Sequence, residues 1–182
     1  MILFTAFNAF QNIVTRINEE AGDYTLGPFR FALNYFVFMV SNLFAPQVKY
    51  SEKWLMTLAA LTYVLQYSTG LLMEGTSNEV KFISAAVGST INGIGASFLW
   101  TNMGSYLHQV CHYYGKVKEK GYYFGLFNMI FSVSTIIGSI VVTFGLSLFS
   151  HFIYFIIVSG VALLAFFYGM FFLKDIRKIH NK

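Results

Sequence analysis

The chain has 182 residues, of which 56% are hydrophobic, 19% aromatic and only 11% charged. A typical soluble domain carries about 25% charged residues, so the composition indicates a membrane protein and argues against an ordinary soluble domain. The net charge of +4 comes from 12 Lys and Arg against 8 Asp and Glu. Its distribution along the chain, described below, makes nucleic-acid binding the poorer explanation.

Six apolar stretches are candidates for membrane-spanning helices, each of which needs about 20 mostly apolar residues. They are too long and too uniformly apolar to be the strands of an outer-membrane barrel. We therefore expect an all-α protein with one six-helix transmembrane domain over residues 1–173 and a cytoplasmic basic tail at 174–182. In chain order the predicted spans are 1–15, 28–46, 53–74, 80–106, 122–148 and 151–173.

The first span is the shortest, because 15 residues rise about 22 Å against a hydrocarbon core of about 30 Å. It either continues upstream of Met1 or begins inside the membrane among neighbouring helices. A cleaved signal peptide is not expected, because the start lacks a basic segment and its apolar part carries Asn8, Gln11 and Asn12.

Small and polar residues gather in the first and fourth spans, whereas span 151–173 is almost entirely aliphatic and aromatic. Small residues let helix backbones approach closely, and buried amides find partners across helices. We therefore expect the first and fourth spans to face protein or a cavity, and the last span to face lipid. The candidate cavity or helix-contact residues are Asn8, Gln11, Asn12, Asn92 and Asn102, and the candidate packing residues are Gly88, Gly93, Gly95, Gly104, Gly121, Gly125 and Gly138.

Trp100 is predicted to be an interface anchor. A helix over residues 80–106 rises roughly 39 Å, so its last turns leave the hydrocarbon near the cytoplasmic boundary. There a Trp ring stays in the apolar layer while its N–H meets a polar group. Asn92 lies deeper, and we expect it beside Asn8, Gln11 or Asn12 of the first span.

The basic residues support the number of spans and their orientation. With six spans and a cytoplasmic N-terminus, nine of the twelve Lys and Arg residues lie inside, and only Arg16, Arg30 and Lys81 lie outside. This distribution obeys the positive-inside rule. We therefore expect both termini, Cys111 and the segment 116–120 to be cytoplasmic.

Motifs for catalysis, metal binding or cofactor binding were not found in the sequence, so we expect no enzyme, no metal and no cofactor. His108, Cys111 and His112 offer three ligands, whereas structural zinc normally takes four. A single Cys111 also forms no intrachain disulfide. No ionisable residue lies in the middle of a predicted span, which argues against proton-coupled transport by this chain alone.

Four further segments occur in this order along the chain: LFTAFNAFQNIVTRINEEAG, LNYFVFMVSNLFAP, NGIGASFLWTNMGSYL and GYYFGLFNMIFSVSTIIGSIV. They resemble the first half of the Unc-ninety-three-like family, ion-channel regulatory proteins of the major facilitator superfamily. The resemblance implies a twelve-span protein, of which this chain corresponds to the N-terminal half, built from two inverted three-helix repeats. The polar first and fourth spans are the first members of two such groups.

Three functions follow from the sequence as alternatives. The first is an accessory or regulatory subunit of an ion channel or other membrane protein, bound through helix faces. The second is a half-size facilitator, acting as a dimer or as part of a twelve-span protein. The third is a structural subunit of a large membrane complex. The expected partners are the lipid bilayer and another membrane protein or second half-bundle, in a homodimer or a hetero-complex, and no nucleic acid.

Overall fold

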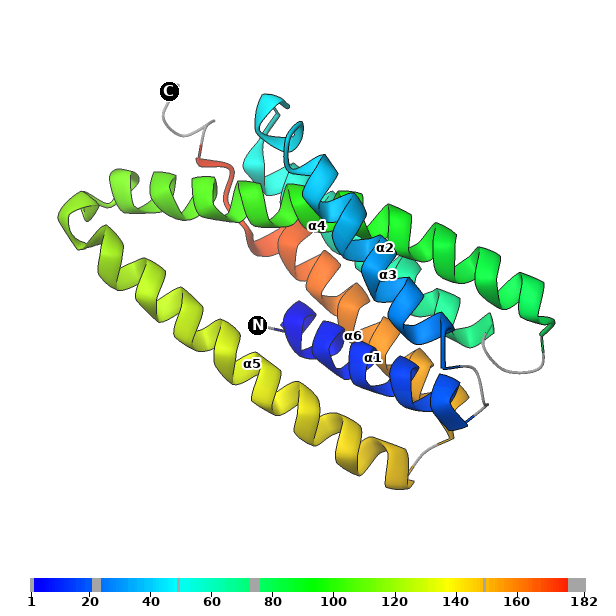
Figure 1. The fold of residues 1–182 in the computed structure, drawn as a ribbon. Coiled ribbons are helices and arrows are strands. Elements are labelled where there is room, and N and C mark those ends of the chain that lie inside the picture. The colour runs from blue at the N-terminus through cyan, green and yellow to red at the C-terminus, as the bar shows by residue number, and fades with distance from the viewer. Residues whose placement is uncertain (1, 21–23, 49, 73–75, 149, 177–182) are drawn as a thin grey trace.

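The computed structural model is an all-helical bundle (Figure 1) and describes residues 2–20, 24–48, 50–72, 76–148 and 150–176. The predictions for the tail beyond residue 176 lie outside the described residues. Within those ranges six α-helices follow one another, joined in part by three 3₁₀ turns. They are α1 (Ile2–Glu20), α2 (Leu26–Ser41), η1 (Ala45–Gln47), α3 (Glu52–Ser68), η2 (Thr69–Leu72), α4 (Asn78–Tyr113), η3 (Val117–Glu119), α5 (Lys120–Leu148) and α6 (His151–Phe172).

The helices follow in the predicted order, but several helix ends differ from the bounds of the predicted spans. The fourth helix runs to Tyr113 instead of ending at residue 106, so most of the predicted loop is helical. It ends where Gly115 adopts a left-handed backbone, φ 66°. The N–H of Gly115 donates to the carbonyl of His112 at 3.1 Å, and the N–H of Lys116 donates to that of Cys111 at 2.7 Å. This pair of bonds is the Schellman motif, which satisfies the last carbonyls of a helix.

Four stretches of the described chain are long and apolar enough to cross a membrane: Glu52–Leu72, Asn78–Tyr113, Val117–Gly145 and His151–Phe172. The first two helices fall short of that measure. A helix of 19 residues such as α1 rises about 28 Å and one of 16 such as α2 about 24 Å, and α1 carries amides on its apolar part. The protein is accordingly a multi-pass integral membrane protein by length and composition.

The helices pack in pairs that repeat between the two halves of the chain. The main contacts are α3 with α4 and with α6, α2 with α4, and α1 with α5 and with α6. If α1, α2 and α3 exchange places with α4, α5 and α6, the contact α2–α4 becomes α5–α1 and the contact α3–α4 becomes α6–α1. The contact α3–α6 stays the same. Each half of the chain therefore makes the same set of helix contacts with the other half. In Figure 1, α5 runs obliquely away from the end of α4 and lies alongside α1.

Three glycines of α4 allow α2 and η2 or α3 to approach its backbone closely. A Cβ placed on Gly93 would lie 2.7 Å from the carbonyl oxygen of Asn34, and one on Gly88 would lie 2.9 Å from the side chain of Thr69. A Cβ on Gly95 would overlap the side chain of Thr62. Backbone atoms cannot move away as a flexible side chain can, so Gly93 marks the tightest constraint on α2.

The remaining predicted packing glycines fall into two groups. A Cβ on Gly138 of α5 would lie 2.9 Å from the carbonyl oxygen of Thr5, which fixes the approach of α5 to α1. In contrast, a Cβ on Gly104, Gly121 or Gly125 meets no atom within 4 Å. Those three glycines do not lie at a close helix contact among the described residues.

We expect Gly95→Ala to destabilise the protein by about 1–3 kcal/mol, because the new methyl group overlaps Thr62 and overpacking costs that much. Gly160→Ala on α6 is the matched control, since a Cβ there meets open space. That control gains up to about 1 kcal/mol from better helix propensity. Thermal unfolding of the two purified variants in mild detergent measures both effects, and equal melting temperatures would contradict the close contact.

Candidate functional site

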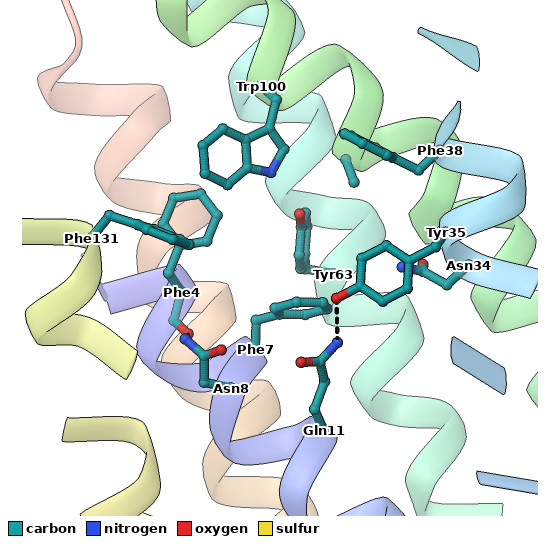
Figure 2. A pocket seen from close by; sticks show the side chains of 11 residues that line it. Phe4, Phe7, Asn8, Gln11, Asn34, Tyr35, Phe38, Tyr63, Trp100 and Phe131 are labelled. Atoms are coloured by element: carbon teal, nitrogen blue, oxygen red, sulfur yellow. Dashed lines mark hydrogen bonds between the residues drawn. The ribbon is translucent and has the colours of Figure 1, made fainter. Parts of the chain in front are cut away.

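A pocket of about 290 Å³ lies between the first five helices (Figure 2). It is a partly open hollow, neither sealed inside the bundle nor flat on its surface. Helices from both halves of the chain contribute to the same wall. The lining residues are Phe4, Phe7, Asn8 and Gln11 of α1, Asn34, Tyr35 and Phe38 of α2, Tyr63 of α3, Ala96 and Trp100 of α4, and Phe131 of α5.

Two amide side chains of α1 give the pocket its polar character. The Nε2 of Gln11 donates to the Tyr35 hydroxyl at 3.1 Å, which links α1 to α2 (Figure 2). The Nδ2 of Asn8 donates to the carbonyl of Phe4 at 2.9 Å and to Oγ1 of Thr135 on α5 at 3.2 Å. Asn8 and Gln11 stand one turn of helix apart on the same face, so α1 presents both amides to the pocket.

Three aromatic rings gather at the end of the pocket away from Gln11 and Tyr35 (Figure 2). The ring centroids of Phe4 and Trp100 are 5.1 Å apart, those of Phe4 and Phe131 are 4.9 Å apart, and those of Trp100 and Phe131 are 5.1 Å apart. These distances fall in the range preferred by aromatic pairs. Figure 2 shows the three rings gathered on one side, away from Gln11 and Tyr35. Trp100, predicted to be an interface anchor, thus lies in a pocket wall that joins α1, α4 and α5.

Asn92 has a different partner from the one predicted. Its Nδ2 donates to Oδ1 of Asn34 on α2 at 3.0 Å, and both side chains are buried. The expected neighbours were amides of the first span, so that pairing was wrong. Asn34 was not among the predicted amides, although it is a lone amide in the apolar run LNYFVFM, which is the signal that indicates such a contact.

The other two predicted amides lie outside the pocket. Asn102 is buried and its Nδ2 donates to the carbonyl of Phe98 in its own helix at 2.8 Å. Asn12 is exposed on α1. Of the five candidates, Asn8 and Gln11 line the pocket, and Asn92 supports its wall through Asn34.

Two charged side chains near helix starts are buried. Arg30 of α2 is completely buried, donates from Nη2 to the Gln66 carbonyl at 3.4 Å and to the Thr69 hydroxyl, and lies 5.1 Å from the Phe10 ring centroid. Glu52 at the start of α3 accepts from Nε2 of Gln109 on α4 at 2.7 Å. Both residues join helices, and neither lines the pocket.

The chemistry available in the pocket is neutral. Among the 11 residues that line it, none is an acid, a lysine, an arginine or a histidine. The amides and the Tyr35 hydroxyl donate and accept hydrogen bonds, and the aromatic rings bury apolar surface. The pocket therefore suits a neutral group with an apolar body and a hydrogen-bonding end. His108, Cys111 and His112 lie on the last turns of α4, and the described residues contain no group of three side chains placed to hold a metal ion.

Comparison with known proteins identifies relatives over most of the chain. The profile of the family described as ion channel regulatory protein UNC-93 matches residues 14–174. The chain is 28% identical over 150 residues to protein unc-93 homolog A of Xenopus laevis, covering 78% of the chain and 30% of that relative. It is 29% identical to the homologues A of Bos taurus and of Danio rerio, over 150 and 149 residues. The chain thus spans about 30% of the length of these relatives, and no solved structure matches it.

We expect Asn92→Leu to destabilise the bundle, because it leaves the Asn34 amide without its partner on α4. Asn34→Leu has the same effect, and the double variant costs less than the sum of the two. Interhelical hydrogen bonds in membranes contribute about 0.6 kcal/mol on average and at most about 1.7 kcal/mol. We expect the coupling free energy between Asn34 and Asn92 to fall in this range. Unfolding in denaturing detergent measures it, with Asn102→Leu as a control for a bond within one helix. Strictly additive costs would show that the pair does not interact.

Proposed function

The chain belongs to the family of the ion channel regulatory protein UNC-93, and we propose that it is a non-enzymatic accessory subunit that binds and regulates another membrane protein. The observation that carries this proposal is the neutral pocket on a side of the bundle whose helices expose much apolar surface. A channel partner is the first candidate, because regulation of channels is what the family description states.

We also propose that all six helices span the membrane and that they form one half of a major facilitator bundle. The exchange of helix contacts between α1–α3 and α4–α6 supports two repeats of three helices. Inverted repeats of this kind are common in transporter folds. The low apolarity of α1 is compatible with a span, since Phe10, Ile13 and Val14 are completely buried against other helices and need no contact with lipid.

The surface for the partner is proposed to be the side formed by α2 and α5 around the pocket. Only 17% of the most apolar 18-residue stretch of α5 is buried in the bundle, compared with 22% for α6 and 50% for α4. Exposed apolar side chains occur on α2 at Phe36 and Met39 and on α5 at Ile136. A second protein on this side would cover the pocket and these side chains together.

A half-size facilitator is the second candidate. The pocket is open on one side and offers hydrogen bonds without charge, which suits a neutral solute. A second copy of the chain would have to close the path. The lining residues include no group for proton coupling, so this candidate is restricted to passive movement of a solute.

Incorporating a photoreactive phenylalanine at Met39 or at Ile136 tests the partner surface in native membranes. We expect both positions to crosslink to a second polypeptide, and the same probe at Phe171 of α6 to react mainly with lipid. All three side chains are exposed. A crosslinked product of twice the chain's mass favours the facilitator, and a heterologous product favours the accessory subunit. Lipid labelling alone at all three positions would reject the surface.

The orientation is tested by introduced cysteines, because the native Cys111 is buried and reacts poorly with reagents. In a Cys111→Ser background, we expect Lys118→Cys to react from the cytoplasmic side and Glu79→Cys from the opposite side, since both residues are exposed. The reason is the segregation of nine basic residues to the predicted inside. Labelling of both positions by an impermeant reagent from one side would contradict the proposed topology.

A further inference from the structure

A second cavity, of about 600 Å³, lies between α1, α3, α4 and α6. It is at the end of the bundle that holds the start of α1, the start of α3 and the end of α6. Its volume falls in the range of roughly 300–1,000 Å³ that small-molecule sites occupy. The walls are made largely of hydrocarbon, including Leu3, Met56, Leu99, Met103 and Leu173.

Two of the three hydroxyl groups of the wall, those of Thr57 and Tyr106, already bond within the protein, and the third belongs to Tyr168. Thr57 Oγ1 donates to the carbonyl of Lys53 at 2.8 Å, and the Tyr106 hydroxyl donates to the carbonyl of Lys174 at 3.2 Å. A polar ligand would therefore find few hydrogen bonds here. Apolar cavities exclude water and take up hydrocarbon, and in a bilayer the available hydrocarbon is the acyl chain of a lipid.

Two lysines stand close in the chain to residues that line this cavity, at the same end of the bundle. Lys53 precedes the wall residue Thr57 by one helical turn, and its ammonium nitrogen lies 5.3 Å from the centroid of the Trp54 ring. Lys174 directly follows the wall residue Leu173 and is exposed. Lysine with Trp and Tyr is the combination that lines a membrane–water interface, and basic residues at the cytoplasmic surface attract anionic lipids.

The acidic residues beside these lysines, Glu52 and Asp175, are less exposed than Lys174. The Glu52 carboxylate is buried and accepts hydrogen bonds from Gln109 at 2.7 Å and from Ser105 at 3.4 Å, which directs it towards α4. Asp175 is only half-exposed and has an interaction of its own. Of these two acidic residues only Asp175 keeps any exposure, so Lys53 and Lys174 leave a net positive charge at this point.

We propose that this cavity binds one anionic phospholipid, with an acyl chain between α1, α3, α4 and α6 and the phosphate group on Lys53 and Lys174. The site is distinct from the neutral pocket and from the proposed partner surface. Lipid binding at this site does not require a bound partner protein. The inference therefore goes beyond the proposed function and does not depend on the partner surface being correct.

The test uses the full chain in phosphatidylcholine vesicles that contain a trace of phosphatidylserine with a photoreactive group in its acyl chain. Mass spectrometry then maps the labelled peptides. We expect labelling of α3 around Met56 and α4 around Met103, and much weaker labelling by the matching phosphatidylcholine probe. A basic residue near an anionic surface is worth about fivefold in binding, so K53Q/K174Q should lose on the order of 25-fold.

A filling variant separates the cavity from the general lipid surface. Ala165→Phe places a ring in the cavity wall and should abolish labelling, whereas Leu164→Phe, at a neighbouring residue that is 66% exposed, should leave it unchanged. Equal labelling by the two lipid probes, or labelling that K53Q/K174Q leaves intact, would overturn the assignment of the headgroup. Cavity labelling that persists in Ala165→Phe, or preferential labelling by a photoreactive sterol, would overturn the acyl-chain site.

Discussion

The close approach of other helices to the glycine face of α4 is the constraint on which the rest of the bundle depends. Gly93 admits the backbone of α2, and Gly95 admits α3, at distances where any Cβ would overlap the neighbour. This approach brings Asn34 within a hydrogen bond of Asn92. It thereby fixes the face of α2 that carries Tyr35, and Tyr35 accepts the bond from Gln11. The pocket exists because a small-residue stripe lets these backbones come together.

The apolar runs, together with the distribution of basic residues between them, were enough to predict the number and order of the helices, because lipid requires every backbone group to be bonded within a helix. The helix ends were harder, since a helix can continue into water until something stops it. In α4 the residue that ends the helix is Gly115. It lies beyond the apolar run, in a segment that was predicted to be a loop. The first helix likewise extends through residues that were assigned to a loop, to Glu20.

The site was predictable in part, and for a physical reason. Amides in an apolar helix must find partners, so Asn8, Gln11 and Asn92 were expected at contacts or at a cavity, and the structure puts the first two in the pocket. The pairing of the amides depends on the rotation of each helix about its axis and on its position along the membrane normal. The sequence alone does not specify either quantity. The complete burial of Arg30 could not be predicted for the same reason, because its position near the start of α2 does not indicate which helices surround it.

The central claim is that the side formed by α2 and α5 around the neutral pocket receives another membrane protein. An electron cryo-microscopy map of the complex isolated from native membranes in mild detergent tests it most directly. The account predicts protein density against α2 and α5 that covers Met39 and Ile136, with detergent around the outer faces of α3 and α6. A map in which α2 and α5 face detergent while the partner lies on α3 and α6 would contradict it.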